Sequence, residues 1–468
     1  MSFKNKKIAY LISHGHTARG AMQTGLLRKL GERGINVVVI TRMDTEEQLA
    51  KSLVEQGVSI EYYNPPSSRF EKQMIIFRSY VHQDIRKNHA LWEKHQRRTI
   101  DSNASIKIRM LNCSYLFLGV LIRNVSVLKN LYVFFEKKFY QNSSADTLLK
   151  KIKPDAIIST RPVDSMEGYM LNSATRLKIK KIFYILSWDN ITSKGIFTEV
   201  GDYYLTWGEV MNQELQEYYG VNDSQLFLTG VTHFDVHINV KTNPNPQKYL
   251  SELGLNTQYP YLFFTMSAPY FSPDEIAIVE QLARDIDDCL YGSEMQLIIR
   301  PHIQNVQGYL ADPTWLPRLE SLVSDKVALD RPELIKSELT WSMSTDDMLK
   351  LSNLIAGASV CLNSGSTIAI EALIMGKPVV IPAFDVQENR PFWQSVKRLE
   401  RFLHLNKFYS FGGVSLVRSF DELHSEILRY LEDQSYRQKG RALTASMECY
   451  QLDGKSTERM VNHIDNLI

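Results

Sequence analysis

A short hydroxyl-rich turn is the part of this sequence whose residue types and spacing could do chemistry. An apolar run ends at Leu362, and residues 363–367 (Asn-Ser-Gly-Ser-Thr) lead into a helical pattern that carries Glu371. A helix N-terminus offers backbone N–H groups and a partial positive charge, which favour a phosphate. Glu371, four residues past Thr367, is placed to accept hydrogen bonds from a ribose diol. The sequence therefore indicates a nucleoside diphosphate site that contains Asn363, Ser364, Gly365, Ser366, Thr367 and Glu371.

The same turn also fits ordinary α/β architecture, because Ser and Thr cap many helices that bind nothing. Two further polar groups strengthen the nucleotide interpretation. Ser267 follows an apolar run at 261–266, and Arg300 and His302 follow another at 295–299. A guanidinium fork matches phosphate oxygens. We expect Ser267, Arg300 and His302 to complete the phosphate site, with a purely structural turn at Arg300-Pro301-His302 as the alternative.

Apolar strands that alternate with helices must position these residues. The first half has predicted strands at 7–12, 36–41, 58–62, 154–160, 181–186, 202–207 and 225–230, with helices to about residue 30 and at 165–179. The second half has predicted strands at 261–266, 295–299, 327–329, 358–362 and 378–381, with helices at 274–290, 345–355, 368–375 and 420–432. Such alternation predicts two doubly wound parallel sheets. Ligands then bind outside the carboxyl ends of the strands, and we expect both sets of loops to face one cleft.

Residues 69–145 interrupt this alternation and predict a helical insertion in the first domain. Ten lysines and arginines stand against four acids between Arg69 and Arg109, and aromatic residues lie among them. One interpretation is a solvated basic face on packed helices. The other is an amphipathic surface that rests on anionic lipid or holds a lipid-linked acceptor.

Composition limits the class of protein. The chain of 468 residues suits two domains, and 54 basic against 52 acidic residues give no global electrostatic argument for a nucleic-acid partner. The four cysteines are far apart, which disfavours a zinc site or a disulfide framework and favours a reducing compartment. The N-terminus lacks the pattern of a signal peptide, and no apolar run is long enough to span a membrane. We expect a cytoplasmic protein, with peripheral attachment to the inner face of the membrane through residues 69–145 as an additional hypothesis.

The segment from Asp346 to Pro382, with Ser-Gly-Ser-Thr, Glu-Ala-Leu and Gly-Lys-Pro-Val-Val-Ile-Pro, resembles the donor-nucleotide segment of GT-B glycosyltransferases. It is also similar to the CDP-glycerol (polyol-phosphate) transferases and the UDP-N-acetylglucosamine 2-epimerases. Trp207-Gly208-Glu209 and residues 228–235 resemble bacterial surface-carbohydrate transferases, and residues 453–459 resemble the start of their C-terminal helix. Residues 364–366 lack the Ser-Gly-Gly of epimerases, and a second histidine typical of polyol-phosphate transferases is not evident.

The resemblance implies a GT-B-like fold: an acceptor domain at 1–240, a nucleotide-donor domain at 255–440, and a C-terminal helix at 441–468 that crosses back to the first domain. It implies transfer of a sugar from a nucleotide-sugar donor to a hydroxyl of a surface polysaccharide or a lipid-linked acceptor. A polyol-phosphate transferase and a non-catalytic nucleotide-binding scaffold are the alternatives.

In this fold the catalytic base often lies after the first strand, which indicates His16 or His14, since a histidine accepts a proton from a hydroxyl at neutral pH. Asp189 is a further candidate, and Asp164 and Glu167 follow it. Each of these acids has an alternative interpretation as a cap or a loop hydrogen-bonder. No D-x-D or histidine–carboxylate cluster stands out, and Asp346-Asp347 fits a helix start. We expect catalysis without a metal ion or other cofactor, the leaving diphosphate being stabilised by cations and helix dipoles.

Overall fold

The computed structural model describes residues 6–44, 46–66, 68–101, 104–306, 311–335, 337, 339 and 343–468. The described residues form two compact units. The first contains the chain up to His233 together with Ser456–Ile468, and the second runs from Phe234 to Ile335 and from Met343 to Lys455. The division follows His233, so the residues after it belong to the second unit, and helix α22 (Ser456–Leu467) packs on α2 of the first unit.

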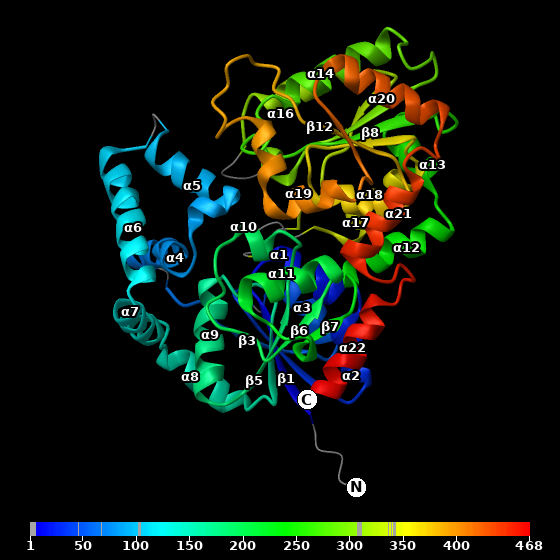
Figure 1. Cartoon of the computed structure of the whole chain (residues 1–468). Coiled ribbons are helices and arrows are strands. Elements are labelled where there is room, and N and C mark those ends of the chain that lie inside the picture. The colour runs from blue at the N-terminus through cyan, green and yellow to red at the C-terminus, as the bar shows by residue number, and fades with distance from the viewer. Residues whose placement is uncertain are drawn as a thin grey trace. The chain divides into compact units, whose positions relative to one another are not determined.

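The first unit is built on a parallel sheet of seven strands in the order β3-β2-β1-β4-β5-β6-β7 (Figure 1). The strands are β1 (Lys7–Ile12), β2 (Asn36–Thr41), β3 (Ser59–Tyr62), β4 (Ala156–Ser159), β5 (Lys180–Tyr184), β6 (Tyr203–Thr206) and β7 (Leu226–Leu228). Its other elements outside the insertion are α1 (Gly15–Ala18), η1 (Arg19–Gln23), α2 (Leu26–Glu32), α3 (Gln48–Glu55), α9 (Ser165–Arg176), α10 (Asn190–Ser193), α11 (Glu209–Tyr219), η3 (Asp223–Gln225) and η4 (Thr232–Phe234). The central strands are buried along nearly their whole length, as strands covered on both faces must be.

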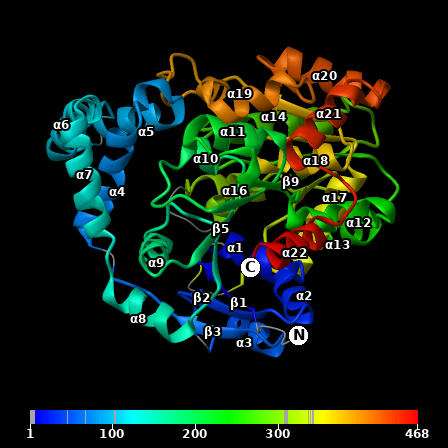
Figure 2. The same ribbon diagram turned by 60° about the horizontal axis from the view of Figure 1, so that its bottom comes forward.

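The helical insertion predicted between β3 and β4 is confirmed. It consists of α4 (Arg69–His82), η2 (Ile85–Lys87), α5 (His89–Thr99), α6 (Ile106–Asn124) and α7 (Ser126–Phe139), and α8 (Ser143–Ile152) leads back to the sheet. These helices stand together on one side of the first unit (Figure 2). Asparagine and serine caps start most of them: the side chain of Asn88 accepts the amide of Leu91, and that of Ser105 accepts the amide of Ile108.

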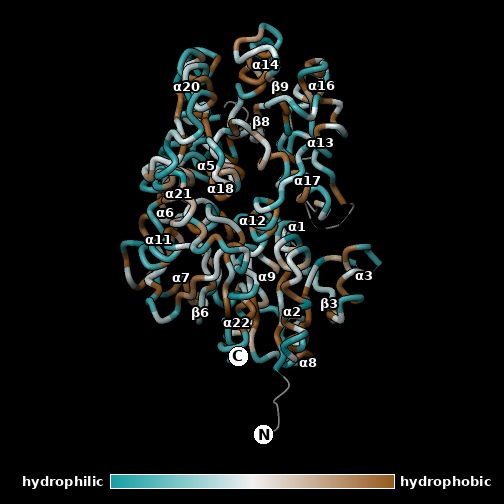
Figure 3. Tube along the Cα trace, turned by 90° about the vertical axis from the view of Figure 1, so that its right-hand side faces the viewer, coloured by the Kyte–Doolittle hydropathy of each residue, from teal (hydrophilic) through white to brown (hydrophobic). Residues whose placement is uncertain are grey.

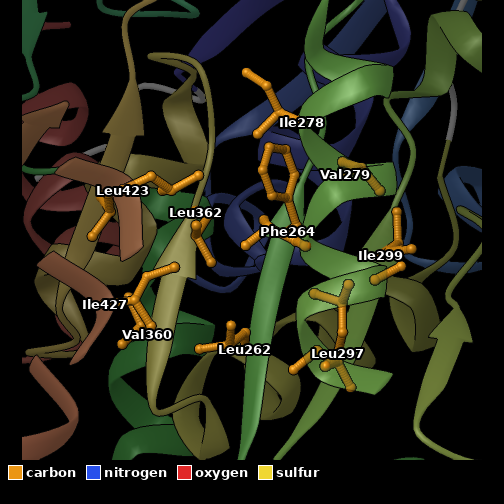
Figure 4. Close-up of a cluster of buried hydrophobic side chains, with 14 of the residues drawn as sticks. Leu262, Phe264, Ile278, Val279, Leu297, Ile299, Val360, Leu362, Leu423 and Ile427 are labelled. Atoms are coloured by element: carbon orange, nitrogen blue, oxygen red, sulfur yellow. The ribbon is translucent and has the colours of Figure 1, made fainter. Parts of the chain in front are cut away.

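The second unit has a parallel sheet of six strands in the order β10-β9-β8-β11-β12-β13. The strands are β8 (Tyr261–Thr265), β9 (Gln296–Arg300), β10 (Val327–Leu329), β11 (Val360–Leu362), β12 (Val379–Pro382) and β13 (Ser415–Val417). Its helices are α12 (Asp235–Thr242), α13 (Pro246–Glu252), α14 (Glu275–Asp287), α15 (Ile303–Val306), α16 (Trp315–Glu320), α17 (Thr345–Gly357), α18 (Thr367–Ile374), η5 (Val396–Arg401), α19 (Leu403–Ser410), α20 (Phe420–Glu432) and α21 (Gln438–Cys449). Leucine, isoleucine and valine side chains from β8, β9, β11, α14 and α20 interdigitate in its core (Figure 4).

The prediction of two parallel α/β sheets is confirmed, and the differences are local. β13 was not predicted, because a three-residue strand gives no readable alternation. The sequence between the first strand and the helix that ends near residue 30 predicts a loop at residues 13–20, but α1 begins at Gly15, where the side chain of His14 caps the helix by accepting the amide of His16. The histidines of the predicted loop therefore lie at the start of a helix.

Candidate functional site

Each sheet has one topological switch point, where the chain changes the direction in which it adds strands. In the first unit this point lies between β1 and β4, and in the second between β8 and β11. The loops at the carboxyl ends of such strand pairs diverge to opposite faces of the sheet and leave space for a ligand. In the second unit these loops contain Ser267, two residues after β8, and Asn363, the first residue after β11. The expected phosphate residues therefore lie at the place where this architecture binds ligands.

Glu275 joins the two loops of the second unit. One carboxylate oxygen accepts the amide of Ser267 at 2.6 Å, and the other accepts the hydroxyl of Ser364 at 2.5 Å. The side chain is completely buried, and this burial raises the pKa of the Glu275 carboxyl to about 8. A carboxyl that keeps its proton at neutral pH thus holds the two expected ligand loops together.

The turn before α18 is built by Asn363. Its buried side-chain oxygen accepts the amides of Gly365 at 2.9 Å and Ser366 at 3.1 Å. Ser366 caps α18 by accepting the amide of Ile368. Two of the backbone N–H groups expected to bind phosphate are therefore already used inside the turn. The half-buried Ser366 and Thr367 and the dipole of α18 remain available to a ligand.

Glu371 lies one turn inside α18 and is buried. Nε2 of His237, on α12, lies 3.0 Å from Oε2 of Glu371, and Nδ1 of His237 lies 2.7 Å from the hydroxyl oxygen of Ser352, on α17. His237 and Ser352 are completely buried. Helices α12, α17 and α18 thus meet at the carboxylate expected to bind a ribose.

Arg300 does not have the role that the sequence suggested. Its guanidinium is buried and donates to both oxygens of Asp347, at 2.7 and 2.8 Å, and to Asp330. Asp347 also accepts the amide of Glu333, and Asp330 also contacts Lys350. We therefore correct the expectation that Arg300 binds a phosphate. Its side chain links β9 to α17 and to the end of β10, because its guanidinium donates to the carboxylates of Asp347 and Asp330.

His302 is half-buried, and burial lowers its pKa to about 4. Nδ1 accepts the amide of Gln304 at 3.1 Å, so the proton of the neutral ring lies on Nε2. The ring of His302 is therefore neutral at neutral pH, and it brings no positive charge to a phosphate.

In the first unit, His14 and His16 lie at the start of α1 with ring centroids 5.2 Å apart. Burial, the neighbouring His16, and then Arg161, Lys194 and Arg42 lower the pKa of His14 to about 2. Because Nδ1 of His14 accepts the amide of His16, the ring carries its proton on Nε2. His14 is therefore neutral and a poor proton acceptor, whereas His16 is the more exposed of the two.

The cations near His14 follow other strands of the same sheet. Arg42 follows β2 and pairs with Asp164 at 2.7 Å, and Lys194 follows α10 and pairs with Asp189 at 2.9 Å. Asp189 also accepts the hydroxyl of Ser193. Lys194 also acts on His14, so Asp189 lies in the same region as the histidines. The ion pair with Lys194 engages the carboxylate of Asp189, which disfavours it as a proton acceptor.

The insertion holds the loop that contains Asp189. Asn88 donates to the carbonyl of Thr192 at 2.7 Å, and Lys94 donates to that of Ser193 at 2.6 Å. Arg78 donates to the carbonyls of Ile196 and Phe197 and pairs with Glu136 at 2.6 Å. Arg78 and Lys94 are thus engaged in internal contacts, which fits packed helices. The exposed basic residues of 69–109 are Arg69, Lys72, Arg86, Lys87 and Lys107.

In the structure, Glu275 joins Ser267 to Ser364 and so to the turn 363–367. Glu371 lies beside His237. Both Glu275 and His237 escaped the sequence analysis. Glu275 looked like an ordinary first-turn acid of a helix. His237 follows the segment 228–235, and only its long-range partners reveal its role. Within the described residues, no group of three or more histidine, cysteine, aspartate or glutamate side chains is arranged to hold a metal ion.

Comparisons with known proteins now give the fold a context. No protein-family model matches the sequence, and no curated protein matches it. The UDP-GlcNAc 2-epimerase from Neisseria meningitidis bound to UDP-GlcNAc is similar, with a TM-score of 0.57, 13% identity, and 98% of this chain and 100% of that chain covered. The S. aureus MnaA–UDP co-structure is similar with a TM-score of 0.56 and 12% identity, and 99% of this chain and 98% of that chain are covered. A glycosyltransferase from Rickettsia africae is similar with a TM-score of 0.51 and 11% identity, and 99% of each chain is covered.

These similarities extend over nearly the whole chain at low identity, so they establish the fold. The protein has the GT-B-like architecture that its sequence pattern predicted. Glycosyltransferases and sugar-nucleotide epimerases share that architecture, and the reaction has to be inferred from the residues.

Proposed function

We propose that the protein is a metal-independent glycosyltransferase that moves a sugar from a nucleotide-sugar donor to a hydroxyl of a surface-polysaccharide or lipid-linked acceptor. One observation carries the proposal. The Ser364–Thr367 turn and the fixed carboxylate of Glu371 follow β11, at the switch point of a sheet of GT-B type. Phosphate and ribose groups are the ligands that such a helix start and such a carboxylate suit.

The second unit offers four groups to a donor. The hydroxyls of Ser366 and Thr367 and the dipole of α18 suit the diphosphate, and the carboxylate of Glu371 suits the ribose diol. Arg300 is not part of this set. Without Arg300, the dipole of α18 and neutral hydrogen-bond donors stabilise the leaving diphosphate in the proposed reaction, together with any cations that the acceptor side supplies.

In the proposed reaction, the oxygen of an acceptor hydroxyl forms a bond with the anomeric carbon of the donor sugar. The bond from that carbon to the diphosphate oxygen breaks, and the nucleoside diphosphate leaves with the electron pair. The hydroxyl proton passes to His16. His14 positions His16 by capping α1.

A sugar-nucleotide epimerase is the second candidate, because the similar epimerase structures have the higher TM-scores, 0.56 and 0.57. Against it, residues 364–366 read Ser-Gly-Ser and not the Ser-Gly-Gly of epimerases. An epimerase changes the donor sugar without any acceptor. Incubation with the donor alone, followed by NMR of the sugar ring, therefore distinguishes the two reactions.

Thermal unfolding with UDP, GDP, CDP, CMP and ADP tests the donor site. A ligand present at a hundred times its Kd stabilises the folded state by about 2.7 kcal/mol. We expect one nucleotide to raise Tm in the wild type and to lose this effect in Glu371→Gln. A response to CDP or CMP alone would favour the polyol-phosphate alternative. No response to any nucleotide would contradict the proposal.

The second unit supplies a matched control. Asp285 is a buried carboxylate that lies 2.7 Å from Nε2 of His424, as Glu371 lies near His237. It sits ten residues after Glu275 on α14, about 15 Å further along that helix. Asp285→Asn should lower Tm in the absence of nucleotide as Glu371→Gln does, and it should keep the response to nucleotide. Binding without turnover on any acceptor or donor would favour the scaffold alternative.

A further inference from the structure

The outer helices of the insertion expose an unusual number of large apolar side chains. On α6, Ile106 is 74% exposed, Met110 68% and Phe117 71%; on α7, Val127 is 75% exposed, Phe134 52% and Phe135 58%. We name these six residues the apolar face. In both helices they recur at helical spacing, so each helix gathers them on one side. Contiguous exposed apolar surface of this kind marks an interaction site.

The opposite side of α6 is a true helix–helix interface. A β-carbon on Gly119 would lie 2.6 Å from the carbonyl oxygen of Tyr80, so α6 and α4 are in direct backbone contact. Around it lies a small core of Tyr80, Ile85 and Leu91 with Tyr115 and Leu116 packed against them. In Figures 1 and 2, α6 and α7 form the outer side of the insertion. The inner side of α6 is therefore already packed against the insertion, and the apolar face lies on its other side.

Charge around the apolar face has one sign. Residues 102–135 contain no aspartate or glutamate, and the next acid, Glu136, is buried against Arg78 and His82. Lys107, Lys129, Lys137 and Lys138 are exposed on the same two helices, and the ammonium of Lys138 lies 4.7 Å from the ring centre of Phe134. Apolar side chains beside lysines, with no exposed carboxylate among them, suit an anionic lipid surface.

The shape of the pair favours adsorption over spanning. Within the described residues no single helix is long and apolar enough to cross a membrane, whereas α6 and α7 together pass that test but are bent by 112° at their junction. Figure 3 colours the trace of the whole chain by hydropathy. A bend of this size directs the second helix away from the axis of the first, which suits two helices lying in the plane of the headgroups.

We propose that the apolar face of α6 and α7 binds the surface of a bilayer that contains anionic lipid. The lysines contact the headgroups, and the apolar side chains enter the boundary with the acyl chains. Arg78 on α4, and Asn88 and Lys94 at the start and middle of α5, hold residues 192–197. Because α6 packs on α4 and α5, the bound surface is mechanically connected to the loop that carries Asp189. The proposal is independent of the proposed transfer reaction.

Flotation with vesicles of phosphatidylcholine alone, or with about one third phosphatidylglycerol, tests the proposal. We expect binding to the anionic vesicles at low salt, weaker binding at high salt, and little binding to the neutral ones. Phe134→Ser with Phe135→Ser should lower the partition coefficient at least tenfold. Lys129→Glu, Lys137→Glu and Lys138→Glu should each lower it roughly fivefold or more. Val323→Ser with Leu443→Ser, at residues 54% and 49% exposed on the second unit, should change nothing.

Two native cysteines allow a direct measurement of contact. Cys113 is exposed on α6 at the spacing of Met110 and Phe117, and Cys289 is exposed on the second unit, whereas Cys361 and Cys449 are buried. An environment-sensitive fluorophore on Cys113 in Cys289→Ser should shift to the blue when anionic vesicles are added. The same fluorophore on Cys289 in Cys113→Ser should not shift.

Equal shifts at both cysteines, or flotation that survives the double serine variant, would overturn the proposal. So would a dimer in sedimentation that the same serine variant dissociates, because the apolar face would then be covered by a second copy. Thermal stabilisation by nucleotide is measured on the same variants. Its presence without vesicle binding refutes the membrane proposal alone, and vesicle binding without it refutes the proposed donor site alone.

Discussion

Glu167 and Glu275 hold equivalent positions in the two sheets. Glu275 links Ser267, after β8, with Ser364, after β11. Glu167 accepts the hydroxyl of Ser13, after β1, and that of Ser159, at the end of β4, both at 2.5 Å. Each buried carboxyl therefore bridges the two strands of a switch point. Glu167, a candidate proton acceptor from sequence, also accepts the amides of Thr160 and Arg161, which leaves it a loop anchor.

The bridge in the second unit should make stability depend on pH. The folded state keeps the Glu275 proton up to about pH 8, whereas an unfolded glutamate releases it near pH 4.5. The folded protein therefore binds more protons in this window, and Glu275 makes the free energy of unfolding fall as pH rises. A pKa difference of one between the two states corresponds to about 1.4 kcal/mol, so the effect reaches a few kcal/mol. Glu275→Gln, which mimics the protonated carboxyl, should gain stability relative to the wild type from pH 5 to 8 in urea unfolding.

Glu448→Gln is the matched control for this prediction. Burial also raises the pKa of the Glu448 carboxyl to about 8, but Glu448 lies on α21 and joins no strand loops. Both variants should flatten the pH dependence of stability, and Glu275→Gln should keep nucleotide binding at neutral pH, because a glutamine amide can replace the protonated carboxyl between Ser267 and Ser364. A stability difference between Glu275→Gln and the wild type that stays constant from pH 5 to 8 would mean that Glu275 is ionised in the folded protein.

A side chain at Gly365 should disrupt the turn before α18. Gly365 has φ +80°, and a β-carbon there would lie 2.6 Å from the hydroxyl oxygen of Tyr409. Gly254 has φ +77° with nothing within 4 Å of its β-carbon position. Gly254→Ala therefore measures the backbone cost alone, about 1 kcal/mol in urea unfolding. Gly365→Ala should cost clearly more and should weaken nucleotide binding, and Tyr409→Phe should restore part of the loss. Equal costs at the two glycines would show that the turn yields easily.

His237 should control the carboxylate of Glu371. In His237→Leu the buried Glu371 loses its neighbour at 3.0 Å, which should cost about 1–3 kcal/mol of unfolding free energy and reduce nucleotide affinity. His237→Leu combined with Glu371→Gln should cost less than the sum of the single changes, because the two residues act as one unit. Additive costs in this double-mutant cycle would contradict the prediction, because they would show that the two side chains do not interact energetically.

How far the sequence predicts this protein depends on the range of the interactions involved. The strands and the hydroxyl turn were predictable, because apolar runs and helix caps are local signals. The expected function of Arg300 was not, since its partners Asp330 and Asp347 lie 30 and 47 residues away. An arginine at the end of a strand gives the same sequence pattern whether its guanidinium binds a phosphate or a buried carboxylate.

The histidines depend on the range of their interactions in the same way. The position of His14 and His16 after β1 was readable, but the tautomer of His14 depends on which atom donates to Nδ1, and that required the helix start at Gly15. His237 gave no signal at all, because neither Ser352 nor Glu371 is near it in sequence. Local pattern thus predicted the candidate residues, and long-range hydrogen bonds show which of their atoms are engaged within the fold.

Arg300 should matter for stability more than for ligand binding. Arg300→Leu leaves Asp330 and Asp347 buried without their shared cation, and breaking such a pair costs about 3–5 kcal/mol. Arg300→Leu with Asp347→Asn should recover part of that loss. Nucleotide affinity, measured by titration on the folded fraction below Tm, should change little. A stable Arg300→Leu protein that no longer binds nucleotide would restore the sequence-based expectation of a phosphate ligand.

His14 and His16 should respond differently to substitution. Asparagine at position 14 can still accept the amide of His16, so His14→Asn keeps the start of α1, whereas His14→Ala removes this cap. We expect His14→Asn to keep most of kcat, His14→Ala to lose more, and His16→Asn to lose a factor of about 10²–10⁴, the usual contribution of a general base. Single-turnover transfer assays with a fixed donor measure this order. If His14→Asn is as inactive as His16→Asn, the ring of His14 itself takes part in the reaction, and its Nε2–H becomes the group to place against the acceptor.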